Sequence, residues 1–285
     1  MTARTAASPS KAHAYEVDAS RRRLSHAGVL ETWQYREVLL AFMARQLKAK
    51  YKQAAIGIGW GVLQPLLASL LLSIVLGRFA HLGSEGAPYF VFALAGMVLW
   101  TFFSAALASS AESVTRESSM VRKVYFPRQI LPLAAVGAAM VDLPAPLLFL
   151  LGADLLSGGR PALTWLLIPI PFLLISLAAT ALGLVASALN VYYRDVRHVL
   201  PFILQVMMFS SPVMYSLSLV PASWREAYEV LNPIAVAIQD LRQVVLHDSW
   251  PDLWVNVGAL VWLVLLVAAG HYLFKLLERD FADQL

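Results

Sequence analysis

Residues 163–190 read LTWLLIPIPFLLISLAATALGLVASALN and contain no charged side chain. A helix needs about 20 consecutive apolar residues to cross the ~30 Å hydrocarbon core of a bilayer, and this stretch is longer than that. Lipid offers no hydrogen-bond partner to a bare backbone, so the stretch predicts a membrane-spanning helix. It therefore decides the fold class, which we expect to be all-α and embedded in a membrane.

Five further apolar stretches of similar length make this a protein with six predicted spans. The whole chain of 285 residues is 59% hydrophobic and 14% charged, with a mean hydropathy of +0.65. Soluble domains carry about 25% charged residues, so a soluble enzyme and a disordered chain are both excluded. The predicted spans are residues 54–77, 88–108, 129–156, 163–190, 199–220 and 253–274.

Two of the predicted spans carry helix breakers. Asp142, Pro144 and Pro146 interrupt the third span, and Pro212 interrupts the fifth. A proline inside a helix removes one backbone hydrogen bond and clashes with the preceding turn. We therefore expect both spans to be broken, with a re-entrant arrangement as the alternative to full crossing.

The positive charges predict the orientation of the spans. Of the lysines and arginines, 18 lie in segments on the N-terminal side of the predicted membrane and 4 on the opposite side. Cytoplasmic segments carry the excess of such residues, so both termini are predicted to be cytoplasmic. Residues 1–30 are predicted to be a disordered cytoplasmic tail, and residues 31–285 a single transmembrane domain.

Residues 33–52 have the pattern of an amphipathic helix that lies in the membrane interface before the first span. Tyr35 and Phe42 fall on its apolar face, and Arg45 and Lys48 on its charged face. Two readings stay open for this helix. It is either a generic membrane anchor or a surface to which a cytoplasmic partner binds.

Residues 109–128 form the longest predicted cytoplasmic connection after the N-terminal segment. Ser113 or Thr115 is expected to cap a short helix, and Pro127 to end it. The connection is either a positively charged loop without further role or a piece that docks in a groove of another protein. The docking candidates are Glu112, Arg116, Glu117, Arg122, Lys123 and Tyr125.

A pathway through the spans is expected where aromatic side chains lie beside small or polar ones, because an aromatic ring is a flat apolar surface on which a sugar ring can rest. The predicted outer segment 221–251 is expected to form a half-span or interfacial helix that acts as a lid. The candidate pathway-lining residues are Trp60, Gln64, Trp100, Phe102, Met207, Phe209 and Tyr215.

The chain lacks the usual motifs of enzyme chemistry. It has no cysteine, no GxxxxGK[ST] phosphate loop, no HExxH, no paired metal-ligand spacing and no GxSxG elbow. We expect no catalytic residue, no metal site and no nucleic-acid partner. Asp142 is the one carboxylate deep in a predicted span, and a packing or helix-breaking role is favoured over a proton-transport site.

Four segments together resemble one family. They are KYKQAAIGIGWGVLQPLL at 50–67, ESSMVRKVYFPRQILPL at 117–133, NVYYRDVRHVLPFILQVMMFSSPVMY at 190–215 and LNPIAVAIQDLRQVVL at 231–246. The chain is similar over residues 33–275 to the membrane (permease) subunits of type-2 ABC exporters that move polysaccharides such as O-antigen, capsule and teichoic acid.

The resemblance implies an interfacial N-terminal helix, six spans and re-entrant outer helices between spans five and six. It implies a homodimer around one pathway in the bacterial inner membrane, and two copies of a separate ATPase that dock on residues 112–127. ATP and Mg²⁺ would then bind to that ATPase, and this chain would bind no cofactor. The cargo would be a lipid-linked polysaccharide such as O-antigen, which is exported for the biosynthesis of lipopolysaccharide.

Three alternatives remain at this point. A type-2 ABC exporter of a drug or lipid would share the fold. A membrane-embedded sugar or lipid transferase would need carboxylates or histidines clustered at one interface, whereas Asp154, Asp195 and His198 are scattered. A proton-coupled carrier would need more ionisable groups within its spans than Asp142.

Overall fold

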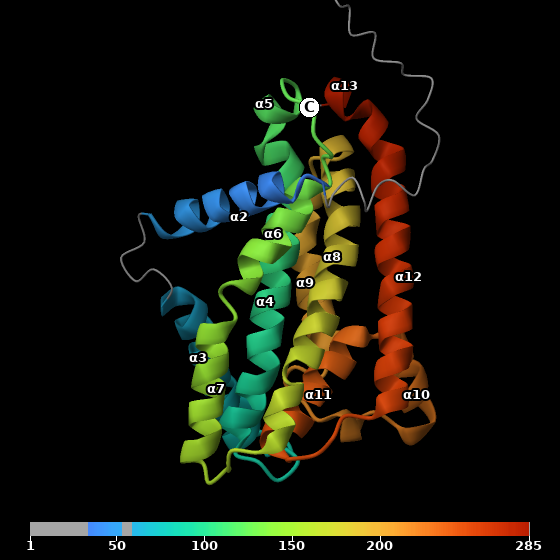
Figure 1. Ribbon diagram of the computed structural model, residues 1–285. Helices are drawn as coiled ribbons and strands as arrows, with labels where there is room; N and C mark the ends of the chain where they lie inside the picture. Colours follow the sequence, from blue (N-terminus) through green and yellow to red (C-terminus); the bar gives the residue numbers. More distant parts are fainter. Residues whose placement is uncertain (1–33, 53–58, 285) are drawn as a thin grey trace, which may run out of the picture.

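The computed structural model describes residues 34–52 and 59–284, and the described part is a bundle of helices (Figure 1). The predicted tail at 1–30 and the start of the first predicted span at 54–58 lie outside the described residues. The helices are α2 (Arg36–Tyr51), α3 (Gly59–Leu72), η2 (Ser73–Phe79), α4 (Tyr89–Arg116), α5 (Ser118–Val121), α6 (Ile130–Met140), α7 (Pro144–Leu156), η3 (Leu163–Leu167), α8 (Pro169–Tyr192), α9 (Val196–Ser210), η4 (Leu217–Leu219), α10 (Ala222–Leu231), α11 (Pro233–Leu246), α12 (Leu253–Leu277), η5 (Glu278–Asp280) and α13 (Phe281–Gln284).

Within the described residues, five helical stretches are long and apolar enough to cross a membrane. They coincide with five of the six predicted spans, and with them the all-α, multi-pass membrane fold is confirmed. The third is broken between α6 and α7, as expected from Asp142, Pro144 and Pro146. The stretches are Gly59–Phe79, Tyr89–Arg116, Ile130–Leu156, Leu163–Tyr192 and Leu253–Asp280.

The fifth predicted span, residues 199–220, is broken as expected from Pro212 and forms no continuous helix over that range. The helix α9 has 15 residues and ends at Ser210, followed by an extended Ser211 with ψ near 150°. The residue before a proline is pushed out of the helical region, and Pro212 has no N–H to continue the ladder. At 1.5 Å per residue, α9 is about 22 Å long, short of a full crossing.

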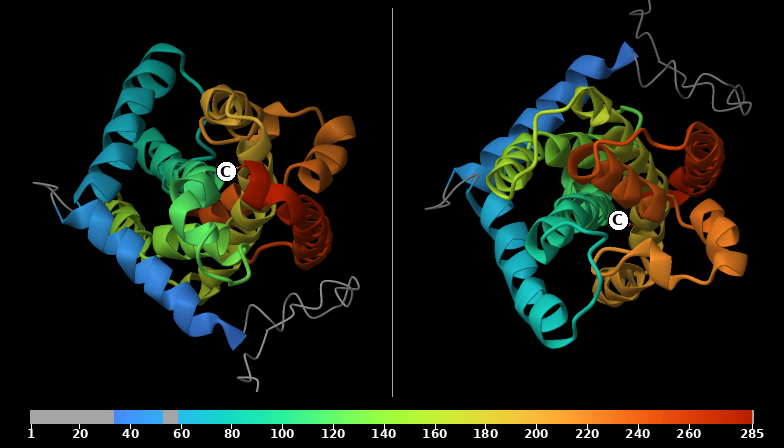
Figure 2. Two further views of the ribbon diagram at one scale, coloured as in Figure 1. Left: turned by 90° about the horizontal axis from the view of Figure 1, so that it is seen from above. Right: turned by 90° about the horizontal axis from the view of Figure 1, so that it is seen from below.

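The long helix α4 forms the centre of the bundle, with α8, α6, α3 and α11 packed around it (Figures 1 and 2). Most of its residues from Tyr89 to Val114 are buried. Small residues set two of the close helix crossings. Gly183 of α8 faces Ser110 of α4, and Gly270 of α12 faces the carbonyl of Ala181 in α8. Such small-residue contacts let membrane helices approach closely.

The segment after α9 turns into two short helices at the end of the bundle opposite α5 and α13, which we call the distal end (Figure 1). The helix α11 enters the bundle, contacts α8 and α4, and is buried over most of its length. The helix α10 stays outside it, against α12 and α11. The expected pair of helices is therefore present, and one of the two is a core element.

Candidate transport pathway and coupling surface

The helix α2 lies across the bundle with its apolar face covered by protein. Phe42 is buried, and its ring centroid lies 5.6 Å from that of Phe126. Met43 contacts Gly137 of α6, where an added Cβ would meet the Met43 side chain at 2.8 Å. Tyr35 packs partly buried on the same cluster. This side of α2 therefore packs on α6 and on the segment around Phe126.

The charged face of α2 divides into a paired and an exposed part. Arg45 forms an ion pair with Glu117, and its guanidinium lies 5.0 Å from the centroid of the Phe42 ring. Lys48 is exposed to the surroundings. The ion pair ties α2 to the segment that follows α4.

The expected short helix in this connection is α5, but neither Ser113 nor Thr115 caps it. Instead α4 continues without interruption to Arg116, and Ser113 is buried inside it with its hydroxyl donating to the Ser110 carbonyl at 2.7 Å. Serine hydroxyls can bond back to the preceding turn, and this removes them from a capping role. Arg116 is paired with Glu112 at 2.7 Å across one helical turn.

The exposed part of the predicted docking set is the turn after α5. Arg122 and Lys123 are exposed, and Tyr125 is 62% exposed beside Val124 at 53%. Val121 and Phe126 on either side are buried in the core formed with α2. The turn therefore projects from the end of the bundle as a basic and aromatic tip that is anchored at both ends (Figure 1).

Asp142 lies at the break between α6 and α7 and is held by the end of α2. The Lys50 ammonium is 2.5 Å from the Asp142 carboxylate, and the Tyr51 hydroxyl donates a hydrogen bond to the same carboxylate. Burial and the neighbouring Asp142 raise the pKa of the Tyr51 hydroxyl, so that it stays a donor. The favoured packing role of Asp142 agrees with these contacts, and its basic partner Lys50 was not predicted.

Exchanging the two charges tests this contact. We expect Lys50→Asp and Asp142→Lys each to lower the melting temperature of the purified protein, and the double exchange to restore most of the loss. The pair is partly exposed, so the coupling free energy should be about 0.5–1 kcal/mol. A double-mutant cycle measures it; additive losses would show that the two residues do not interact.

The predicted pathway-lining residues fall into two groups. Trp60 and Phe209 are 54% and 58% exposed, Gln64 is also exposed, and Met207 and Tyr215 are partly buried. Trp100 and Phe102, in contrast, are buried in the core of the protomer. The expectation that these two line a pathway is corrected, because they fill the space between α4 and its neighbours.

The exposed candidates lie on α3 and α9. Together with η2, these helices lie at the rim of the bundle in both end views (Figure 2). Their outward faces are broad and apolar, and in a single protomer nothing in the described part of the chain covers them. The exposed large hydrophobic residues on these helices include Trp60, Leu67, Leu71, Ile74, Phe79, Phe202, Ile203, Val206 and Phe209.

A buried arginine fixes the chain where α9 ends. Arg242 of α11 is fully buried and donates from Nη2 to the Val213 carbonyl at 2.9 Å, from Nη1 to the Tyr215 carbonyl at 3.3 Å and from Nε to the Phe92 carbonyl at 3.3 Å. Its guanidinium lies 3.6 Å from the centroid of the Phe92 ring. Burial lowers the pKa of Arg242 to about 9, opposed by Glu85, so the side chain is protonated at neutral pH.

Comparison with known proteins places this architecture. The ABC-2 type transporter family matches residues 37–246. The O-antigen export system permease protein RfbA of Myxococcus xanthus is 27% identical over 90% of this chain and 98% of its own. A protein of the same name from Klebsiella pneumoniae is 24% identical, covering 87% and 94%. The polysialic acid transport protein KpsM of Escherichia coli is 19% identical, covering 72% and 80%. With its multi-pass helical fold and a family match over most of its length, the chain belongs to the ABC-2 type transporter family.

Proposed function

We propose that this protein is the channel-forming subunit of an ATP-driven exporter that moves a lipid-linked polysaccharide, such as O-antigen, from the cytoplasm across the bacterial inner membrane.

 The observation that carries the proposal is the set of matched relatives, whose names give O-antigen export and polysialic acid transport as their activities. The protein would lie in the inner membrane with both termini in the cytoplasm, as the distribution of lysine and arginine favours.

The physical chemistry of the cargo supports a lined route. A polysaccharide carries many hydroxyls, and moving each one unpaired into hydrocarbon costs about 4–8 kcal/mol. One protomer has its core filled by α4 and the helices around it. A pathway is therefore proposed between two copies of the chain, lined by the exposed faces of α3 and α9, with Trp60, Gln64, Met207, Phe209 and Tyr215 along it.

The energy for export would come from a separate ABC ATPase, present in two copies, which binds ATP and Mg²⁺. The full sequence has no GxxxxGK[ST] motif to hold the nucleotide phosphates. We assign the docking of this ATPase to residues 112–127. The exposed tip at Arg122, Lys123 and Tyr125 makes first contact, and the Arg45–Glu117 ion pair passes the movement to α2.

The movement can be transmitted further, from α2 to the third span. The helix α2 is attached at one place to the coupling segment through Glu117, and at its end to the α6–α7 break through Lys50 and Asp142. A rigid helix held at two points transmits a displacement between them. Export of a drug or lipid would fit the same helices, but the glycan cargoes of the matched relatives favour a polysaccharide.

Co-purification tests the proposal. We expect the tagged protein to retain a dimer and two copies of the ABC ATPase encoded beside it, and the complex in sealed vesicles to move polysaccharide only with ATP and Mg²⁺. A Walker-lysine variant of the ATPase is the control that binds but does not hydrolyse. Isolation of a functional exporter without any ATPase would contradict the assignment.

A further inference from the structure

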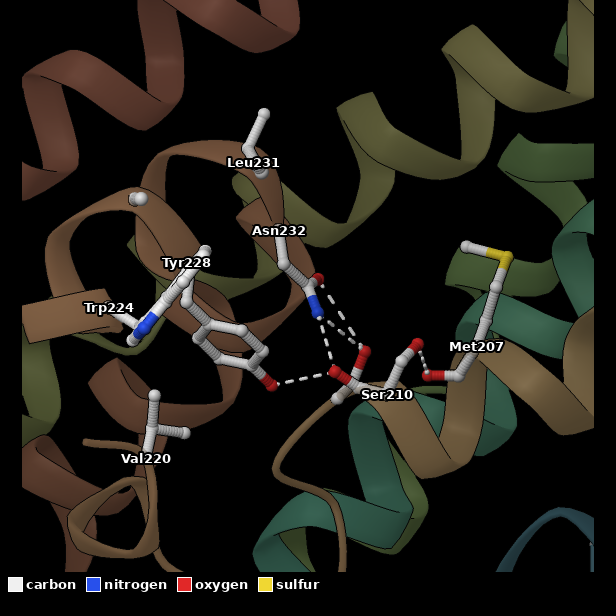
Figure 3. A pocket seen from close by; sticks show the side chains of 9 residues that line it. Met207, Ser210, Val220, Trp224, Tyr228, Leu231 and Asn232 are labelled. Carbon is white, nitrogen blue, oxygen red and sulfur yellow. Dashed lines mark hydrogen bonds between the residues drawn. The ribbon is translucent and has the colours of Figure 1, made fainter.

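A pocket of about 470 Å³ lies between the end of α9 and the helix α10 (Figure 3). Trp224 and Tyr228 form one side of it, Met207 and Ser210 the other, and Asn232 lies between them. We propose that this pocket is a binding site for one or two neutral pyranose rings of the exported glycan. The proposal rests on the proposed function and adds to it a defined sugar site at the distal end.

The pocket is built by the capping of α9. The last carbonyls of a helix lack partners within the helix. Here the Tyr228 hydroxyl donates to the Ser210 carbonyl at 2.7 Å, and the Asn232 amide donates to the same carbonyl at 3.1 Å. The Tyr215 hydroxyl donates to the Phe209 carbonyl at 3.2 Å. These bonds hold α10 in a fixed position against α9, so the space between them is preformed.

The aromatic walls of the pocket suit the apolar face of a sugar ring. Trp224 and Tyr228 are four residues apart on α10 and therefore share one side of the helix. Their rings offer flat apolar surfaces for the C–H face of a pyranose. The polar atoms of Ser210 and Asn232 are already hydrogen-bonded within the chain, so a sugar hydroxyl would use only their remaining lone pairs. The volume falls in the range of ~300–1,000 Å³ that is typical of small-molecule sites.

The absence of charged residues in the pocket decides which part of the lipid-linked polysaccharide it can bind. None of its nine lining residues carries a charge. A phosphate of a lipid anchor would lose its hydration here without gaining a cationic partner. A neutral ring carries no such cost. The Tyr228 and Asn232 donors already serve α9, so binding should be weak, as suits a chain that must move on.

The pocket also borders the proposed pathway. Met207 and Ser210 lie on α9, the helix that carries Phe209, and the Tyr228 hydroxyl is 3.3 Å from that of Tyr215. A ring that leaves the exposed face of α9 therefore reaches Trp224 without crossing another helix of the same protomer. This continuity distinguishes the pocket from an isolated surface hollow.

Cysteine labelling tests occupancy, because the natural chain contains no cysteine. Ala227→Cys places a thiol in the pocket, and Ala222→Cys places one at an exposed position of the same helix that does not line it. The probe is the oligosaccharide released by mild acid from the exporting cell's own polysaccharide, added to the complex in lipid nanodiscs. We expect it to slow maleimide labelling of Ala227→Cys several-fold and to leave Ala222→Cys unchanged.

Two outcomes of the labelling would overturn the proposal. Equal labelling rates with and without oligosaccharide would show that no sugar enters. An Ala227→Cys thiol that is already unreactive in the sugar-free complex would show that lipid or the second protomer fills the pocket.

Export provides the second measurement. We expect Trp224→Ala to lower polysaccharide export several-fold with basal ATPase activity retained, and Trp224→Phe to restore most of it. Trp254→Ala is the matched control, since Trp254 is 81% exposed and lies outside the pocket. Normal export by Trp224→Ala would overturn the sugar site alone, whereas a wild-type complex that moves no polysaccharide would overturn the proposed function.

Discussion

Replacing Arg122 and Lys123 together by glutamate should release the ATPase from the complex and reduce export about tenfold or more. The two side chains lie at the exposed tip after α5, between the buried anchors Val121 and Phe126. A reversed charge at a complementary interface costs several kcal/mol, and each 1.4 kcal/mol is a factor of ten in affinity. Because the tip makes no part of the core, the fold should survive the change.

The measurement is the amount of ATPase that co-purifies, together with the melting temperature of the isolated membrane subunit. Arg194→Glu with Arg197→Glu is the control, because these exposed arginines follow α8 and give the same change in net charge. Glu112, Arg116 and Glu117 are less suitable targets, since they form ion pairs within the chain. Full ATPase retention by the Arg122 and Lys123 variant would refute docking at this tip.

Replacing Arg242 by leucine should have the largest effect on stability. The substitution removes the donors to the carbonyls of Phe92, Val213 and Tyr215, which remain buried. The Phe92 carbonyl keeps its bond within α4, but the Val213 and Tyr215 carbonyls lose their donor, and each buried carbonyl without a partner costs about 1–3 kcal/mol. For a domain of this size a loss of a few kcal/mol lowers the melting temperature by about 10 °C.

Thermal unfolding of the purified protein, followed by the loss of the monodisperse peak, measures this effect. Arg242→Lys should fall between wild type and Arg242→Leu, because one ammonium cannot reach all three carbonyls at once. Arg160→Leu is the control, since Arg160 is exposed. Gly96→Ala perturbs the same contact from α4, where an added Cβ would lie 2.5 Å from the Val213 carbonyl. Unchanged stability in both Arg242→Leu and Gly96→Ala would contradict the assigned role.

The positions of most spans could be predicted from the sequence, because length and hydropathy alone determine whether a helix can cross lipid. The break in the fifth span was predictable as well, because Pro212 ends the helix. The contacts that hold this end could not be predicted: Tyr228 and Asn232 donate to the Ser210 carbonyl and Arg242 to the Val213 carbonyl, and all three residues come from the segment that follows. In the sequence, Arg242 is one of the arginines of the predicted outer segment 221–251. The signal available was its position among Leu241, Val244 and Val245 on a helical repeat.

The candidate site was only partly predictable for a similar reason. Aromatic residues in an apolar span give no sign of the face on which they lie, so Trp100 and Phe102 in the core could not be separated from Trp60 and Phe209 on the surface. Lys50 and Asp142 are 92 positions apart, and only the folded chain brings them together. The Arg45–Glu117 pair is a contact of the same kind.

The shortness of α9 has a consequence for the surrounding solvent. Because the helix is only about 22 Å long, the hydrophobic thickness that it can span is less than the ~30 Å of an undisturbed bilayer. Ser210 at the end of the helix is exposed, so water from the distal side can reach it inside that thickness, whereas Ser211 is buried. Under the proposed function, a passing saccharide would leave water over a shorter stretch than the full thickness of the bilayer.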